Sequence, residues 1–206
     1  MGTTAFAARG QDLALAQRAA EGDRAAQREL FHAQKASVHH TLYRILGANR
    51  DIEDLIQDAF LEIFRALPSF RGDSSLSRWC QTIATRAAYL SIARRKPASV
   101  DLEVVENEIV DRDPDAHRVA NARQAAKRLY AALDKLDAKM RIAFALAVID
   151  GRSLAEVAVL TESSLVAVKT RVWRARRELM KRAHKDPVLA SYLADLGAVE
   201  QSGGAE

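Results

Sequence analysis

Apolar residues recur at the spacing of an α-helix along most of this chain, and this periodicity is the sequence feature that most limits its possible folds. Alanine, leucine, arginine and glutamate abound, and all four favour helices. The chain contains no run of alternating apolar and β-branched residues bounded by turns, which is the pattern of a half-buried strand. The sequence therefore predicts an all-α fold.

Glycine and proline interrupt this periodicity at only a few places, and these breaks predict the boundaries of the helices. Gly47 should end an early helix, and residues 68–75 should form a loop. Pro97 should close the following helix, and Gly151 should separate two later ones.

Residues 98–115 differ from both flanks, because they lack a sustained helical period, are acidic and contain Pro114. We expect a linker there, between two helical modules. After Pro187 a short apolar stretch predicts one docking helix, and residues 201–206 should be disordered. The expected organisation is an N-terminal extension or helix at 1–22, a first module at 23–97, an acidic linker at 98–122, a second module at 123–185 and a C-terminal tail at 186–206.

The size and composition of the chain fit a cytoplasmic protein. With 206 residues it can form one ordinary domain or two small ones, and 49% hydrophobic residues are enough to bury a core. No apolar run approaches the ~20 residues of a membrane span, and the N-terminus lacks the pattern of a secretory signal, so we expect no membrane insertion. The single cysteine, Cys80, also indicates a reducing compartment.

Charge is distributed unevenly along the chain, although the formal net charge is only +4. Residues 69–96 contain six basic residues and one acidic residue, whereas residues 97–122 contain seven acidic and two basic ones. Residues 163–185 contain eight basic residues and one acidic residue. Charge of one sign gathered on one element creates a strong local field. Two basic helical modules are therefore expected to flank an acidic connector.

Residues 153–182 have the pattern of a helix-turn-helix, with a short helix capped by Ser153, a break at 161–163 and a longer basic helix from about Ser164. An apolar stripe of the longer helix should pack on the shorter one; it consists of Val168, Val172, Ala175 and Leu179. The opposite face has the composition that suits base edges, phosphates and thymine methyl groups in a DNA major groove. The residues of this predicted duplex-reading face are Val166, Lys169, Thr170, Arg171, Trp173, Arg174 and Arg177.

A run of arginines can also be no more than a solvated helix face. Trp173 argues against that interpretation, because an indole among arginines, away from the apolar stripe, has little structural reason to be there. We therefore expect this face to contact DNA or another protein.

The helix expected at residues 51–67 starts with Asp51 as its N-cap and carries four acids on one stripe, namely Asp51, Asp54, Asp58 and Glu62. Acids in the first turn suit the helix macrodipole, but Asp58 and Glu62 lie too far along the helix for that explanation. A surface for a protein partner is the better interpretation. The residues expected to face the bundle are Ile52, Leu55, Ala59 and Ile63, with Phe60 and Phe64 at its edges.

A second long helix follows the loop, with Ser74 or Ser75 as its cap. The chain thus contains DxEDLxQDxF, a loop with SFRG, an SLxRWxxxIA core, an RRK end, an acidic linker and a helix-turn-helix with VKTRVWRARREL. This succession, over roughly residues 23–182, resembles the extracytoplasmic-function (ECF) sigma factors of RNA polymerase. Each motif alone is moderately specific, but their order and spacing together are strongly so.

The resemblance implies a protein without enzymatic activity or cofactor that directs core RNA polymerase to promoters. In that family the acidic helix docks on the polymerase, which implies this role for Asp54, Gln57, Asp58, Phe60 and Glu62. The first module, sigma domain 2, binds and opens the minus-ten element, and the second, sigma domain 4, reads the minus-thirty-five element with the face described above. The implied minus-ten residues are Phe70, Arg71, Ser74, Ser75, Arg78, Arg86, Arg94 and Arg95.

Physical chemistry supports this division, because unpaired bases need stacking surfaces and a cationic groove, and the basic segment offers both. Trp79 falls at the family's core tryptophan position, so we expect it to be a packing residue. The resemblance also implies an anti-sigma protein as a partner, and a linker that follows the RNA path of the polymerase.

The chain departs from the family's pattern at several positions. Arg86 and Leu90 stand where members often have asparagine and aspartate or asparagine, which affects the expected base preference at minus-ten. Val166 and Ala167 replace a common Gly-Thr pair before the recognition-helix valine. Cys80 stands where leucine is common, and we expect it to be a small buried apolar residue.

Other classes of function fit the sequence less well. The best candidate for a metal site is the pair Glu29 and His32, spaced as in helical di-metal bundles, but it lacks a second copy. The chain has no Gly-rich phosphate loop, metal-spaced cysteine set or nucleophile elbow, so we expect no catalytic or metal site. The main alternative is a helix-turn-helix transcription regulator that acts without being a polymerase subunit. A regulator binds its operator alone, whereas a sigma factor needs core polymerase.

Overall fold

The computed structural model describes residues 2–48, 51–94 and 114–202, and every element of secondary structure in these ranges is helical, which confirms the predicted all-α class. The elements are α1 Gly2–Ala20, α2 Arg24–Leu46, α3 Ile52–Ala66, η1 Leu67–Ser69, α4 Leu76–Arg94, α5 Pro114–Leu133, α6 Ala138–Phe144, η2 Ala145–Ile149, α7 Leu154–Leu160, α8 Leu165–Ala183 and α9 Pro187–Ser202. Within the described ranges, no helix is both long and apolar enough to cross a membrane.

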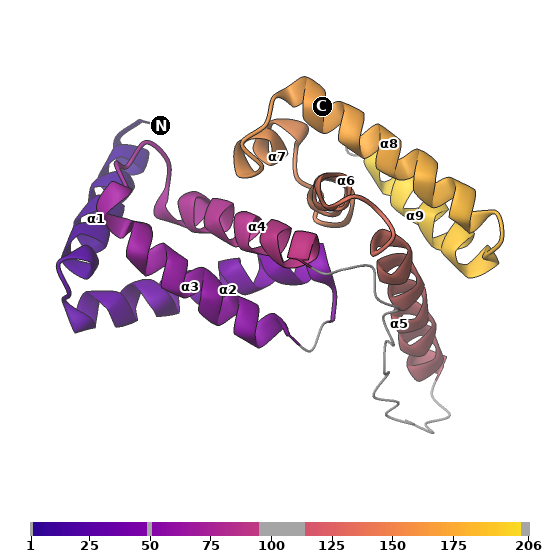
Figure 1. Ribbon diagram of the computed structural model, residues 1–206, viewed down its shortest axis with the longest axis horizontal. Coiled ribbons are helices and arrows are strands. Elements are labelled where there is room, and N and C mark those ends of the chain that lie inside the picture. Colours follow the sequence, from indigo (N-terminus) through magenta and orange to yellow (C-terminus); the bar gives the residue numbers. More distant parts are fainter. Residues whose placement is uncertain (1, 49–50, 95–113, 203–206) are drawn as a thin grey trace.

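Helices α1 to α4 form the N-terminal module, in which α2, α3 and α4 pack on one another and α1 crosses one end (Figure 1). Its core consists of aliphatic and aromatic side chains contributed by all these helices, including Leu30, Leu42, Ile45, Ile63 and Leu76. Burial of such side chains is the main source of stability in a small helical bundle.

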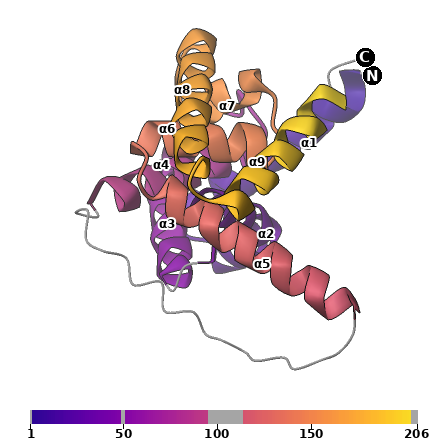
Figure 2. The same ribbon diagram turned by 90° about the vertical axis from the view of Figure 1, so that its right-hand side faces the viewer.

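Helices α5 to α9 form the C-terminal module (Figure 2). Helix α6 runs directly into η2, a π-helical turn, and this continuous segment is almost wholly buried. Helix α8 packs on both α6 and α7, and α9 lies against α5 and α8. The docking helix expected after Pro187 is thereby confirmed, with Leu189 buried.

Side-chain caps begin several helices where the sequence predicts them. The Ser153 hydroxyl accepts a hydrogen bond from the Glu156 N–H, while the Glu156 carboxylate accepts one from the Ser153 N–H, which forms a capping box at α7. Ser164 caps α8 in the simpler way, by accepting from the Ala167 N–H at 3.2 Å. Asp51 occupies the N-cap position of α3, but its side chain makes no capping hydrogen bond there.

Gly47 ends α2 as expected, and two features of the structure require a glycine there. Its φ is +75°, in the region that favours glycine. A Cβ atom at this position would lie 2.7 Å from Cγ of Tyr130, on α5. Gly151 lies between η2 and α7, as predicted.

Three boundaries differ from the sequence-based expectation. Residues 67–69 form a 3₁₀ turn before the loop, because Pro68 suits the first turn of a helix. Helix α5 begins at Pro114 for the same reason, so residues 114–122, expected in the linker, are helical. Helix α9 includes Gln201 and Ser202, which were expected to be disordered, while Pro97 and residues 98–113 of the expected linker lie outside the described residues.

The two modules also pack directly on each other, which no sequence pattern revealed. Helix α4 contacts α6 and α7, and α2 contacts η2. In Figure 1, α6 is seen nearly end-on between the N-terminal bundle and α8.

Candidate nucleic-acid interface

Helix α8 has the two opposite faces that its sequence predicts. Val168, Val172, Ala175 and Leu179 are all buried against the rest of the C-terminal module. On the other side, Val166 is 73% exposed and Trp173 is 59% exposed, which is unusual for side chains of this size. The helix therefore presents a partly apolar, strongly basic surface to solvent.

Local contacts order part of this surface. The Arg177 guanidinium lies 5.5 Å from the centre of the Trp173 ring, within cation–π range. The Thr170 hydroxyl donates to the Val166 carbonyl at 2.9 Å, which leaves its lone pairs free to accept. Arg171 is half-buried and donates to the Ser163 hydroxyl at 2.7 Å, so it braces the turn of the helix-turn-helix. Lys169 and Arg174 are exposed.

A groove of about 980 Å³ runs between α3 and α4 in the N-terminal module. Its α3 wall is mainly acidic: it contains Asp51, Asp54, Asp58 and Glu62, the stripe predicted from the sequence, and one basic residue, Arg65, which pairs with Glu62. Its α4 wall carries Arg86 and Arg94, and Trp79, Ile83 and Leu90 provide apolar lining. The two walls therefore carry opposite charge. The basic α4 wall suits an anionic partner, and the acidic α3 wall suits a basic one.

The residues expected to dock on the polymerase do not share one surface. Asp54, Asp58 and Glu62 are exposed along the groove, and Gln57 is exposed outside it. Phe60 is only 4% exposed, and its ring lies 4.6 Å from that of Phe31. The prediction that Phe60 lies at an edge of the bundle is wrong, because it lies one turn after the buried Ile56 and is buried in the core, so its side chain is not exposed to a partner in this structure.

The predicted minus-ten loop also differs from expectation at its aromatic residue. Phe70 is 7% exposed, and its ring packs 5.3 Å from that of Trp79. Phe70, one of the implied minus-ten residues, is therefore buried in this structure and offers no open stacking surface to an unpaired base. Trp79 packs against the core, as predicted. Arg71 and Ser75 are exposed, and Ser74 is half-buried.

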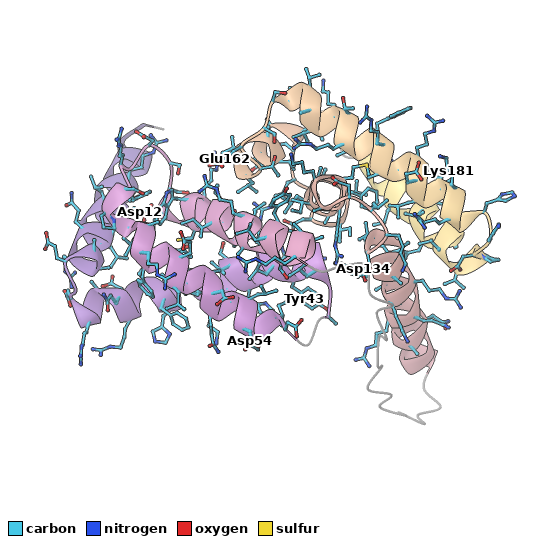
Figure 3. All side chains as sticks on the ribbon, in the orientation of Figure 1. Asp12, Tyr43, Asp54, Asp134, Glu162 and Lys181 are labelled. Atoms are coloured by element: carbon cyan, nitrogen blue, oxygen red, sulfur yellow. The ribbon has the colours of Figure 1, made fainter. Side chains whose placement is uncertain are left out.

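The start of α4 depends on a residue that sequence reasoning missed. Asp12, on α1, accepts a hydrogen bond from the Leu76 N–H at 2.8 Å (labelled in Figure 3). Ser75, one of the two predicted caps, accepts from the Arg78 N–H at 3.3 Å. The sequence carries no signal for the first contact, because 64 positions separate Asp12 from its partner. Helix α1 thus fixes the end of the loop and the start of α4.

The basic residues of α4 face two directions. Arg94 lines the groove towards α3, whereas Arg78 lies beside α7 of the C-terminal module. Arg86 reaches the helix-turn-helix, where it forms a bidentate pair with Glu162 that includes an Nε to Oε2 contact of 3.0 Å. Arg95 lies outside the described residues.

Cys80 is fully buried, as predicted, and burial raises the pKa of its thiol to about 12. A thiol in this state does not act as a nucleophile or a metal ligand at neutral pH. Among the described residues, no group of three or more histidine, cysteine, aspartate and glutamate side chains could hold a metal ion.

This geometry defines a class of protein. A rigid helix-turn-helix with an exposed basic helix suits duplex DNA, and a separate helical module pairs a basic wall with an acidic one. Such a protein binds nucleic acid and at least one further macromolecule.

Comparisons with known proteins identify the family. Residues 30–97 match sigma-70 region 2, and residues 126–179 match sigma-70 region 4. The chain is 28% identical over 176 residues to the ECF RNA polymerase sigma-E factor of Escherichia coli (strain K12), with 82% of this chain and 92% of the relative covered. A relative of the same name from Haemophilus influenzae is 28% identical over 173 residues, with 80% and 91% covered.

Among solved structures, CnrH in complex with the cytosolic domain of CnrY superposes with a TM-score of 0.57 at 24% identity, over 85% of this chain and 98% of that one. This likeness supports the same fold. The chain belongs to the extracytoplasmic-function sigma factors, and it is a promoter-recognising sigma factor of RNA polymerase.

Proposed function

We propose that the two modules divide promoter recognition between duplex and single-stranded DNA. The exposed face of α8 reads the minus-thirty-five element, because one rigid basic helix fits an intact major groove. The loop before α4 and the arginines of α4 hold the separated minus-ten strand. Because Phe70 is packed against Trp79, base capture depends on Arg71 and the α4 arginines.

The acidic stripe of α3 docks on core polymerase. The observation that carries this assignment is the groove between α3 and α4, since its acidic wall repels DNA while its arginine wall attracts it. Acids exposed along a helix beyond its first turn gain little from the macrodipole, so a basic protein surface is the partner that suits them. Asp54, Asp58 and Glu62 are the residues that we assign to this contact.

The protein acts in the cytoplasm, without catalytic activity of its own, and an anti-sigma protein restrains it. Support for such a restraint comes from the fold likeness to CnrH, whose structure contains the cytosolic domain of a second protein.

Run-off transcription with purified core polymerase on a library of randomised promoters tests the proposal. We expect initiation from a subset of promoters that share two elements at a fixed separation, and only when both protein and core polymerase are present. A regulator that acts without being a polymerase subunit would instead bind its operator alone. Sequence-specific binding of duplex DNA by the full chain without polymerase, together with no directed initiation, would contradict our assignment.

A further inference from the structure

Helix α1 supports the minus-ten loop, residues 70–75, at its start, middle and end. At the start, α1 packs against the 3₁₀ turn η1. In the middle, the Leu13 side chain lies beside Gly72, since a Cβ atom at Gly72 would be 3.9 Å from Cδ1 of Leu13. At the end, the Asp12 carboxylate accepts a hydrogen bond from the Leu76 N–H at 2.8 Å (Figure 3). One helix therefore supports the loop along its length.

Packing holds α1 firmly enough to act as this support. Ala16 and Ala19 are only 1% and 2% exposed, and such small side chains let α1 lie close to its neighbours α2, α3 and α4. Ala16 lies one turn after Asp12 on the same face, so the same packing fixes the position of the carboxylate. Helix α1 also precedes residues 30–97, which match sigma-70 region 2. The support of the loop thus comes from a part of the chain outside that matched segment.

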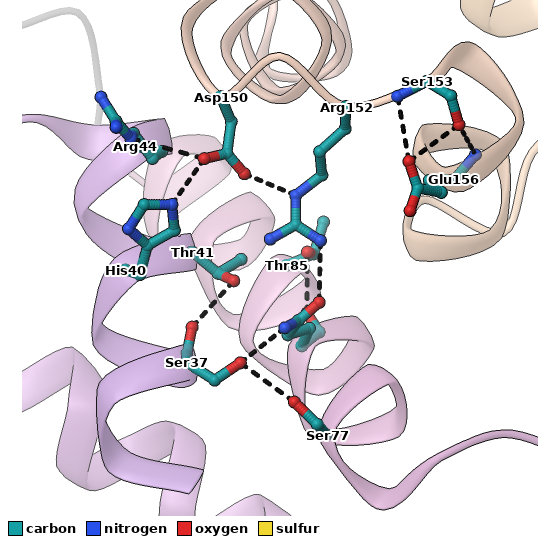
Figure 4. Close-up of polar contacts among 11 residues, drawn as sticks. Ser37, His40, Thr41, Arg44, Ser77, Thr85, Asp150, Arg152, Ser153 and Glu156 are labelled. Atoms are coloured by element: carbon teal, nitrogen blue, oxygen red, sulfur yellow. Dashed lines mark hydrogen bonds and ion pairs between the residues drawn. The ribbon is translucent and has the colours of Figure 1, made fainter. Parts of the chain in front are cut away.

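The body of α4 is held in place independently of Asp12. On α2, the Ser37 hydroxyl lies 3.2 Å from that of Ser77 and accepts a hydrogen bond from Nε2 of Gln81 at 2.5 Å (Figure 4). The first N–H groups of a helix have no partner within the helix, and Asp12 provides one for Leu76. Loss of the Asp12 carboxylate should therefore release the junction between the loop and α4, while α4 itself stays in place.

We propose that Asp12 is a positioning residue for capture of the single-stranded minus-ten element, acting through the loop and not through contact with DNA. The inference rests on the proposed function, because it takes the loop as part of the strand-binding site. Arg71 and Ser75 are exposed on the loop, and a loop already held in one conformation loses less entropy when the strand binds. A carboxylate repels phosphate, so direct contact of Asp12 with the strand would weaken binding.

The test uses core polymerase assembled with the full chain, and a fluorescent single-stranded oligonucleotide that carries the minus-ten sequence of a promoter selected in the run-off experiment. Asp12→Ala removes the acceptor, whereas Asp12→Asn keeps an acceptor oxygen without the charge. Asp137→Ala is the matched control, because the Asp137 carboxylate also accepts from a first-turn N–H, that of Lys139 at 2.9 Å, but caps α6 in the C-terminal module. Arg71→Ala reports whether the loop takes part in strand binding.

We expect Asp12→Ala to weaken oligonucleotide binding by about three- to tenfold, the range that the loss of one capping hydrogen bond allows. Asp12→Asn should restore binding to within about twofold of the wild type, since the bond to the Leu76 N–H can still form. Leu13→Ala, which removes the contact at Gly72, should act like Asp12→Ala. Asp137→Ala should lower the melting temperature as Asp12→Ala does and yet leave oligonucleotide binding unchanged. All these variants should bind core polymerase as the wild type does.

Two results would overturn the inference. If Asp12→Ala changes oligonucleotide binding no more than Asp137→Ala does, Asp12 contributes only to stability. If Asp12→Ala and Asp12→Asn both tighten binding, Asp12 acts by charge repulsion and does not position the loop. Failure of the proposed function would look different, because Arg71→Ala would then bind the oligonucleotide as tightly as the wild type, and the inference would fail with it.

Discussion

Single side chains on one helix can have opposite roles, as Asp58 and Phe60 on α3 show. Asp58 is exposed on the acidic wall of the groove, whereas Phe60 is buried against Phe31. The sequence suggested one docking surface for both residues. Only the structure separates an interface residue from a core residue here.

Asp58→Lys should weaken binding to core polymerase while helix content and melting temperature stay near those of the wild type, because the exposed side chain contributes little to packing. Phe60→Ala should instead cost about 3–5 kcal/mol of the free energy of unfolding, as expected for a buried phenylalanine. Pull-down with core polymerase and urea unfolding measure the two effects. Equal loss of stability in both variants would show that Asp58 is structural.

Arg174, on α8, is a candidate for direct contact with a base of the minus-thirty-five element. Its side chain is exposed on the face opposite the buried stripe, so Arg174→Ala should relax the base preference within the minus-thirty-five element. A bidentate arginine-guanine contact provides about 1–3 kcal/mol of discrimination. Arg182→Ala, which removes the same charge from the last turn of α8, is the control.

Transcription from a promoter library randomised at the upstream element measures this preference. If Arg174→Ala lowers activity uniformly and leaves the base preferences unchanged, Arg174 contacts a phosphate and does not read a base.

At the scale of elements, the helix-turn-helix depends on caps that fix where its two helices begin. Helix α7 has only seven residues, too few to be stable by itself, so the capping box of Ser153 and Glu156 and its packing on α8 must hold it in place. The pKa of Glu156 is lowered, chiefly because the Ser153 hydroxyl hydrogen-bonds its carboxylate, with a further contribution from the Ser153 N–H.

Ser153→Ala should lower the free energy of unfolding by about 1 kcal/mol near pH 7, the usual loss for an N-cap serine. Because the folded state lowers the pKa of Glu156, its stabilising effect is present above the ordinary carboxyl pKa and is lost as the pH falls through the lowered value. The difference between wild type and variant should therefore shrink in acid. Urea unfolding at pH 7 and pH 3 checks this, with Ser191→Ala, an exposed position on α9, as the control.

At the scale of the whole molecule, two modules of different DNA preference must act on one promoter at a fixed distance. The acidic residues 98–113 that connect them lie outside the described residues, so their role stays a prediction from the sequence. The same two modules contact each other directly in the structure, through α4 with α6 and α7 and through α2 with η2.

Deletion of residues 101–108 should leave both modules folded and yet abolish initiation, because the shortened connector no longer spans the distance between the two promoter elements. Circular dichroism establishes folding, and abortive initiation with core polymerase measures function. Deletion of the same number of residues from the C-terminal end, 199–206, is a control for chain length. Full activity of the shortened linker would contradict the two-module account.

The sequence by itself determined the fold class, most helix boundaries and the two faces of α8. These properties depend on local periodicity, caps and turn residues, which act over one or two helical turns. The acidic stripe of α3 was predictable for the same reason, since residues at i, i+3, i+7 and i+11 share a face in any α-helix.

Only the tertiary structure decided which side chains are free to bind a partner. Phe60 and Phe70 are buried by residues distant in sequence, and Asp12 supports α4 from a helix 64 positions away. Arg141 and Asp150 of the C-terminal module make contacts of the same kind with α2. Arg141 donates to the carbonyls of Ile45 and Leu46, and the Asp150 carboxylate pairs with His40. Such contacts form when surfaces of separate helices are complementary, and no local pattern records that complementarity.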